Sequence, residues 1–177
     1  MIEEIYLQSI IKRLKEYKSL GDKTLSQLNE EHMHWVPNEA SNSIGIIIQH
    51  MHGNMRSRWT NFLTEDGEKP WRKRDEEFLF QQHSKESLLV LWEEGWQIVF
   101  DTLSSLLPEH LTQNITIRTE PLNVVDAINR QLAHYSYHVG QIVLLGKWLV
   151  GNDWQSLSIP KGKSLAFNEQ MAYKNKT

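Results

Sequence analysis

The sequence predicts an all-α protein, a four-helix bundle with long connectors and an irregular C-terminal tail. Three observations support this fold class. Apolar residues recur at three- and four-residue spacing through most of the chain, the pattern of helices with one buried face. Serine, asparagine, proline and glycine stand where four long helices would begin or end. The 177 residues suffice for one substantial hydrophobic core but are few for two, so residues 1–177 are expected to form a single domain.

The first helix is expected to begin near the N-terminus. Apolar residues there alternate with lysine and glutamate at helical spacing, and the pattern can be followed as far as Leu28. The pair Gly21-Asp22 would mark a kink or a break in this helix. The segment EEHMHWVPNEASNS comes next, and its proline and its Asn/Ser cluster indicate a connector.

A second helix is expected over about residues 44–63, with either Asn42 or Ser43 accepting a hydrogen bond from its first turn. The segment TEDGEKPWRKRDEEF follows this helix. Asp66-Gly67 is a turn signal, and the proline prevents a simple helix. The polar segment is long for a loop between bundle helices, and long structured loops are often functional.

The third and fourth helices are separated by a short extended segment. Ser84 would cap the third helix, which Pro108 is expected to end. The segment QNITIRTEP alternates in polarity and could be a short strand, but we interpret it as an extended connector. The fourth helix is expected over about residues 122–150, with Pro121 in its first turn and Gly151 at its C-terminal end.

Composition and charge narrow the function classes. A formal net charge of -3 and the lack of a basic face argue against a nucleic-acid or anionic-membrane partner. The chain has no cysteine, so disulfides, thiolate metal ligands and a cysteine nucleophile are excluded. The N-terminal segment lacks a signal-peptide core, and no apolar run of about 18 residues occurs, so we expect a cytoplasmic protein without a membrane helix.

Two histidines four residues apart draw attention to the fourth helix. His134 and His138 lie one turn apart on a stripe that also carries Arg130 and Gln141, within a helix that should be largely buried. Buried polar groups need partners, so these side chains must be hydrogen-bonded, bound to a metal or open to a cleft. Paired histidines at this spacing are typical of helices that present ligands to zinc, but histidines that pack in a core show the same spacing.

The second helix offers a third ligand. His50 follows Ile46 and Ile47 on their inward stripe, whereas His52 lies about 200° away on an ideal helix and must face elsewhere. We therefore choose His50. Asn54, one turn further on, is a candidate contact to the substrate or to a ligand histidine. The remaining four histidines are expected to be solvated: His32, His34, His83 and His110.

Basic residues gather around the second helix and the polar segment after it: Arg56, Arg58, Arg72, Lys73 and Arg74. They could clamp a carboxylate on a substrate or a thiol. Alternatively they are solvated loop residues, and we favour this for most of them because neighbouring acids nearly balance their charge. These acids are Asp66, Asp75, Glu76 and Glu77. The candidate substrate contacts are Asn54, Arg58 and Arg130.

The stretch HMHWVPNEASNSIGIIIQH contains a Trp-x-Pro connector, followed by Ser-Ile and a helix whose second turn ends in histidine. The stretch HYSYHVGQ is an H-x3-H-x-x-Q element on the last bundle helix. Together with the order of the four helices, these two motifs resemble the DinB/YfiT-like superfamily of metalloenzymes. The segment RSRWTNFLTEDGEKPWRKRDEEF further resembles a DinB-like subfamily of uncharacterised function.

The resemblance implies a bundle that holds a divalent metal, usually zinc or nickel, through three histidines. The matching positions are His50, His134 and His138. Relatives are often dimers and include thiol transferases that use bacillithiol, mycothiol or glutathione, as well as metal-dependent hydrolases and isomerases. Three imidazoles would leave metal positions open to activate a water or a thiol, and a thiol would have to come from a co-substrate. Gln141 would either orient a ligand or the bound water, or pack as an ordinary amide.

The residues and the resemblance together predict a divalent-metal-dependent enzyme that acts on a small molecule, as a thiol S-transferase or a hydrolase, and forms a homodimer. Two alternatives stay open. The chain could be a non-catalytic dimeric bundle that binds a metal or a ligand in a stress response, or a bundle whose histidines are structural. Metal content would separate the last alternative from the other two, and turnover would separate the enzyme from the non-catalytic binder.

Overall fold

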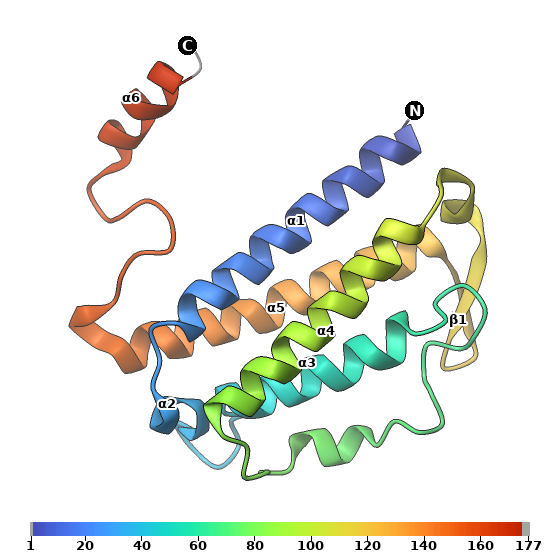
Figure 1. The fold of residues 1–177 in the computed structure, drawn as a ribbon, viewed down its shortest axis with the longest axis horizontal. Helices are drawn as coiled ribbons and strands as arrows, with labels where there is room; N and C mark the ends of the chain where they lie inside the picture. Colours follow the sequence, from blue (N-terminus) through green and yellow to red (C-terminus); the bar gives the residue numbers. More distant parts are fainter. Residues whose placement is uncertain (1, 175–177) are drawn as a thin grey trace.

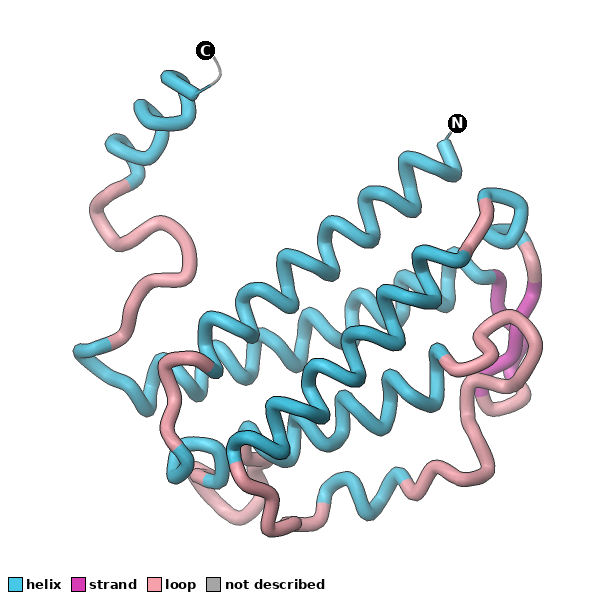
Figure 2. Tube along the Cα trace, viewed as in Figure 1, coloured by secondary structure: helices cyan, strands magenta, loops and turns pink. Residues whose placement is uncertain are grey.

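The computed structural model describes residues 2–174, and long helices make up most of it (Figures 1 and 2). The bundle consists of α1 (Ile2–Leu25), α3 (Ile44–Trp59), α4 (Lys85–Ser105) and α5 (Val124–Val150). The shorter elements are α2 (Glu30–His34), the 3-10 helices η1 (Arg74–Phe78), η2 (Pro108–Thr112) and η3 (Gly151–Asp153), the strands β1 (Asn114–Ile117) and β2 (Glu120–Asn123), and α6 (Ser164–Lys174). The predicted all-α fold class is confirmed.

The four long helices do not simply alternate in direction. In Figure 1, α3 and α4 both run from the α2 end of the bundle toward the hairpin, whereas α1 and α5 run the opposite way. A loop between two parallel neighbours must travel back along the bundle, which explains the length of the connector over residues 60–84. On this return path the connector forms η1, which packs against α3.

Side-chain caps set where the helices begin, as the sequence predicts. Ser43 and Ser84 each accept a hydrogen bond from the backbone N–H three residues further on, at the starts of α3 and α4. Asn123 caps α5 in the same way. Gly151 has a positive φ of 63° at the C-terminal end of α5, a conformation that glycine adopts without steric cost.

Gly21 does not bend α1. The helix is continuous through Leu25, so the expected kink or break at Gly21-Asp22 is wrong. A β-carbon at position 21 would collide with the ring of Trp92. The glycine instead lets α1 and α4 approach closely, and the indole N–H of Trp92 donates a hydrogen bond to Asp22 Oδ1 at 2.7 Å.

Residues 114–123 form a β-hairpin, so their interpretation as an extended connector is wrong. The placement of Pro121 in a helical turn is wrong as well, because Pro121 lies in β2 opposite Thr116 and α5 begins only at Val124. The two-residue turn is Arg118-Thr119, and both residues have a positive φ, of 56° and 64°. Turns of this kind usually contain asparagine or glycine, which is why the sequence does not reveal this one.

Asp66 explains how the turn forms without glycine. Its Oδ1 accepts hydrogen bonds from the backbone N–H groups of Glu68 and Arg118, at 2.7 and 2.8 Å, and its Oδ2 accepts one from Thr119 at 2.8 Å. Burial on its own would raise the pKa of Asp66, but these donors outweigh burial and lower the pKa to about 2. The charged carboxylate therefore ties the start of the connector to the hairpin.

The C-terminal segment is only partly irregular. An extended stretch after η3 leads to α6, a helix that the sequence analysis does not anticipate. In Figure 1, α6 stands away from the bundle, and residues 164–173 are exposed.

The core of the bundle is built around large aromatic side chains. Trp59, Trp96 and Tyr135 are its largest fully buried residues, and the indole N–H of Trp59 donates to the Tyr135 hydroxyl at 2.8 Å. This bond joins the end of α3 to α5, near the candidate ligands. Among the residues that the structure describes, no helix is both long and apolar enough to cross a membrane.

Replacing Asp66 with alanine is expected to lower the free energy of unfolding by about 1–2 kcal/mol at pH 7, because three backbone N–H groups lose their acceptor. Since folding holds the pKa of Asp66 below its ordinary value of 3.8, this stabilisation is complete above that pH and is lost as the pH falls toward about 2. Urea unfolding at neutral and acidic pH would measure it. Asp66→Asn keeps one acceptor oxygen and should lose less stability. Equal stability of wild type and Asp66→Ala at pH 7 would contradict this role.

Candidate metal centre

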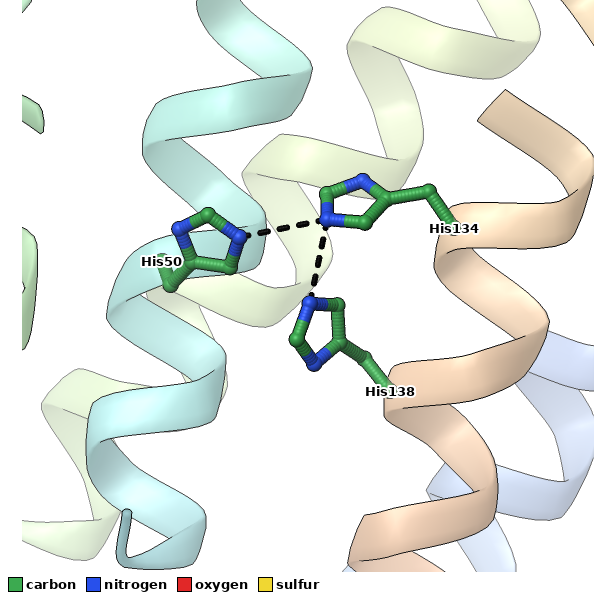
Figure 3. A group of neighbouring side chains, drawn as sticks. All are labelled: His50, His134 and His138. Carbon is green, nitrogen blue, oxygen red and sulfur yellow. Dashed lines mark hydrogen bonds between the residues drawn. The ribbon is translucent and has the colours of Figure 1, made fainter. Parts of the chain in front are cut away.

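Three histidine side chains converge between α3 and α5 (Figure 3). His50 comes from α3, and His134 and His138 come from successive turns of α5. Nε2 of His134 lies 3.2 Å from Nε2 of His50 and 3.0 Å from Nε2 of His138. One ring nitrogen of each residue lies within 4.8 Å of the others, so the group could hold a metal ion. The structure thus brings together the three histidines that the sequence analysis selects.

Two outer partners fix which nitrogens face the centre. Nδ1 of His50 donates a hydrogen bond to Glu77 Oε2 at 2.9 Å, and Nδ1 of His138 donates one to Gln141 Oε1 at 2.8 Å. In their neutral forms, both rings therefore turn an Nε2 lone pair toward His134. Nε2 of His134 carries at most one proton, which cannot satisfy two lone pairs. A cation can accept a lone pair from every ring, so this donor set fits a metal.

Burial keeps His134 and His138 neutral. Loss of surrounding water is the main cause that lowers the pKa of His134 to about 3, and the nearness of other basic side chains, among them Arg72 and Arg58, lowers it further. Burial also lowers the pKa of His138, although its hydrogen bond to Gln141 opposes this shift. Because a metal binds the neutral imidazole, neither ring has to lose a proton to bind one near pH 7.

Glu77 is the outer partner that the sequence analysis misses. Its carboxylate accepts the His50 N–H and also two hydrogen bonds from Arg72, at 2.7 and 2.8 Å. Burial on its own would raise the pKa of Glu77, but the hydrogen bonds from Arg72 and His50 outweigh burial and lower it. A charged carboxylate in this position orients a ligand histidine and raises its basicity.

The expectation that most of the basic residues around α3 and the connector are solvated holds for three of the five, and Arg58 and Arg72 are the exceptions. The side chains of Arg72 and Glu77 are only 2% and 10% exposed. Arg58 on α3 is also buried. Arg56, Lys73 and Arg74 are exposed, as expected. Glu77 lies 27 residues from His50, so no spacing rule joins them, and the length of the connector is the one sequence signal that pointed to this segment.

Gly53 makes room for Glu77. It lies on α3 about one turn after His50, and a β-carbon there would collide with the Glu77 carboxylate. Glycine inside a helix costs about 0.5–1 kcal/mol relative to alanine. The close approach of the carboxylate explains why glycine occupies this position.

A pocket of about 220 Å³ opens beside the histidines. Its lining includes His50, His134 and the three candidate substrate contacts, Asn54, Arg58 and Arg130. Asn54 Oδ1 accepts a hydrogen bond from the Tyr135 hydroxyl at 3.1 Å, which holds the amide against α5. A larger hollow of about 660 Å³ runs along the outside of α1, but its lining contains none of the clustered histidines. We therefore place the candidate site in the smaller pocket.

The other histidines lie outside the cluster. His52 faces α4, with its Nε2 3.4 Å from Glu94 Oε2, in agreement with its expected place on another side of α3. The four histidines expected to be solvated are half-buried instead, and each ring takes part in a hydrogen bond: His32, His34, His83 and His110.

The chain matches a family of known sequences. The model of the family described as Protein of unknown function (DUF1572) matches residues 1–163. This range includes all four long helices and the three clustered histidines. No curated protein shows significant similarity to the chain.

Gly53→Ala is expected to weaken zinc binding about 10- to 100-fold, the loss typical of disturbing the outer partner of a metal ligand. The added methyl group would push the Glu77 carboxylate away from His50 without changing any of the three histidines. Competition with a chromogenic chelator would measure the zinc affinity.

Gly140→Ala is the matched control for this measurement. Position 140 also lies inside a helix, but a β-carbon there would meet nothing within 4 Å in the described part of the chain. This variant should bind zinc as tightly as wild type and gain up to about 1 kcal/mol of stability from the better helix former. If both variants bound zinc equally well, Glu77 would have no part in holding the ligand.

Proposed function

We propose a function for this chain, which belongs to the DUF1572 family, a DinB/YfiT-like family of proteins of unknown function. This membership agrees with the resemblance noted in the sequence, and the narrower DinB-like subfamily stays a prediction. The function proposed is that of a divalent-metal-dependent enzyme that acts on a small molecule, either by thiol S-transfer or by hydrolysis.

The arrangement of donors around His134 is the observation that supports this proposal most. Glu77 and Gln141 hold two ligand rings so that their Nε2 lone pairs point to a common place. Histidines that serve packing alone would pair each acceptor with a donor. Here the Nε2 acceptors of His50 and His138 both face Nε2 of His134, which can donate only one proton. A cation removes this conflict because it can accept a lone pair from every ring.

Each part of the site has a role in the proposed reaction. The three clustered histidines hold a divalent metal, zinc or nickel, and leave further positions on it open. When bound, such a metal lowers the pKa of a water or a thiol and so supplies a nucleophile near neutral pH. Asn54, Arg58 and Arg130 line the adjoining pocket, where they position the substrate.

The two reactions differ in the source of the nucleophile. The sequence contains no cysteine, so thiol transfer needs a low-molecular-weight thiol, such as bacillithiol, as a co-substrate. Hydrolysis needs water alone. The pocket opens directly onto His50 and His134, which supports the use of this pocket by either a thiol or a water.

We further propose that the chain acts as a homodimer. Three large apolar side chains on α5 are well exposed: Tyr137 at 62%, Leu144 at 64% and Trp148 at 69%. Their spacing places them on one stripe of the helix. A second copy of the chain would remove this stripe from water.

Tag-free wild-type protein is expected to carry about one divalent metal per chain, the stoichiometry of a single three-histidine site. The variants His50→Ala and His138→Ala should lose the metal, because two imidazoles hold it far more weakly than three. Their helical content should change little, since the apolar core is untouched. Mass spectrometry for metal content and circular dichroism for helicity would test this. Little metal in wild type, even after incubation with zinc and nickel, would contradict the proposal.

Turnover is the second measurement. Thiol-transfer and hydrolysis substrates should be consumed by wild type and spared by metal-free His138→Ala. If that variant turned over substrate as fast as wild type, the metal-dependent mechanism would be wrong. Full metal occupancy without turnover of any substrate would favour a non-catalytic metal-binding bundle.

A further inference from the structure

Five arginines line the pocket beside the histidines: Arg58, Arg72, Arg74, Arg118 and Arg130. They come from four parts of the fold, namely α3, α5, the turn of the hairpin and the connector. Among the described residues that line this pocket, none is acidic. Segments far apart in the sequence therefore place like charges around one small space.

The nearby carboxylates do not balance this charge. Glu68 Oε2 accepts hydrogen bonds from Arg58 and Arg118, at 2.9 and 3.0 Å, and lies 3.8 Å from Arg72. A single half-buried carboxylate thus faces three guanidinium groups. Arg72 has Glu77 as a further partner, but Glu77 is shared with a ligand histidine.

Arg74 has a weak ion-pair partner, and Arg130 has none among the described residues. Arg74 Nη1 lies 3.7 Å from Asp75, whose side chain is fully exposed, so water screens this pair. Across residues 2–174, no hydrogen bond or ion pair engages the Arg130 side chain. Within the described part of the chain, no close carboxylate neutralises either guanidinium group.

Two buried polar atoms of the lining lack a hydrogen-bond partner among the described residues, namely Arg72 Nη1 and Gln131 Oε1. Their side chains are almost fully buried, at 2% exposure for Arg72 and 3% for Gln131. Leaving a buried donor or acceptor unpaired costs free energy. An anion in the pocket would satisfy the Arg72 donor, and a hydroxyl or amine beside that anion would satisfy the Gln131 acceptor.

We propose that this pocket binds an oxyanion, the carboxylate or phosphoryl group of a small substrate or co-substrate. The planar guanidinium group pairs with either one through two parallel hydrogen bonds. The assignment of the anion to a substrate rests on the proposed function. The binding of an anion as such rests on the arginines and does not require the metal.

The helices set the distance between the anion and the histidines. Arg130 precedes His134 by one turn of α5, and Arg58 follows His50 by two turns of α3, which corresponds to about 6–12 Å along the helix axes. A pocket of about 220 Å³ accommodates a small molecule over this distance. The charged end of the substrate would lie among the arginines, with its reacting end toward the three histidines.

A purely structural role does not explain all five arginines. Arg58 donates to the carbonyl oxygen of Gly67 as well as to Glu68, so part of its function is to hold the connector. Arg130 is exposed and holds no other part of the described chain. Arg130 is therefore the residue whose replacement separates anion binding from folding.

Isothermal titration calorimetry with inorganic phosphate and with succinate tests the proposal. The full chain is used at low, constant ionic strength, because salt screens exposed charges. Wild type should bind about one anion per chain, and Arg130→Gln should bind it about ten- to hundredfold more weakly, the usual effect of losing a charged hydrogen bond. Tighter binding of phosphate would identify a phosphoryl group, and tighter binding of succinate a carboxylate.

Arg13→Gln is the matched control. It removes one positive charge from α1, where Arg13 pairs with Glu16 outside the pocket, and its anion affinity should equal that of wild type. Arg74→Gln, a second exposed pocket variant, should also weaken binding. An absence of saturable binding in wild type, or equal affinities in Arg130→Gln and Arg13→Gln, would overturn the proposal.

Measuring metal content beside these titrations separates the anion pocket from the proposed metal enzyme. Anion binding that depends on Arg130 in a protein unable to hold a metal would support the pocket and count against the proposed enzyme. Metal binding without an Arg130-dependent anion site would support the metal centre and overturn the pocket.

Discussion

The carboxylate of Glu77 is the contact on which the rest of the site depends. It accepts the His50 N–H, which fixes the nitrogen that this ring presents to the cluster, and it pairs with Arg72 through two hydrogen bonds. Without it, Arg72 would be a buried charge deprived of its best counterion, a strongly destabilising state. The Glu77 carboxylate therefore determines both the path of the connector and the orientation of the His50 ring.

The histidine cluster favours a cation, and the arginine pocket beside it favours an anion. A divalent cation among the three imidazoles would add positive charge beside five arginines, and Glu68 and Glu77 offset only part of the total. An anion in the pocket would be attracted by the arginines and by the cation together. By linkage, each of these two binding events would then strengthen the other.

Local pattern in the sequence is enough for the long helices and for the choice of histidines, because helical periodicity decides which face of α3 and of α5 meets the bundle. The rest depends on contacts between residues far apart. Glu77 meets His50 across 27 positions, and Asp66 supports the turn at Arg118 from 52 positions away. No spacing rule in a single sequence connects such pairs. The sequence alone therefore places Glu77 in solvent and reads the hairpin as a connector.

The long separation of the clustered histidines along the sequence also decides when, during folding, the candidate metal centre can form. His50 and His134 are 84 positions apart, so the three imidazoles meet only after α5 has docked against α3. During synthesis from the N-terminus, the ribosome releases α3 and α4 before either histidine of α5. Of the three clustered imidazoles, the nascent chain at that stage offers only that of His50, without the chelate that would retain an ion. Acquisition of a metal would thus mark the completion of folding rather than its start.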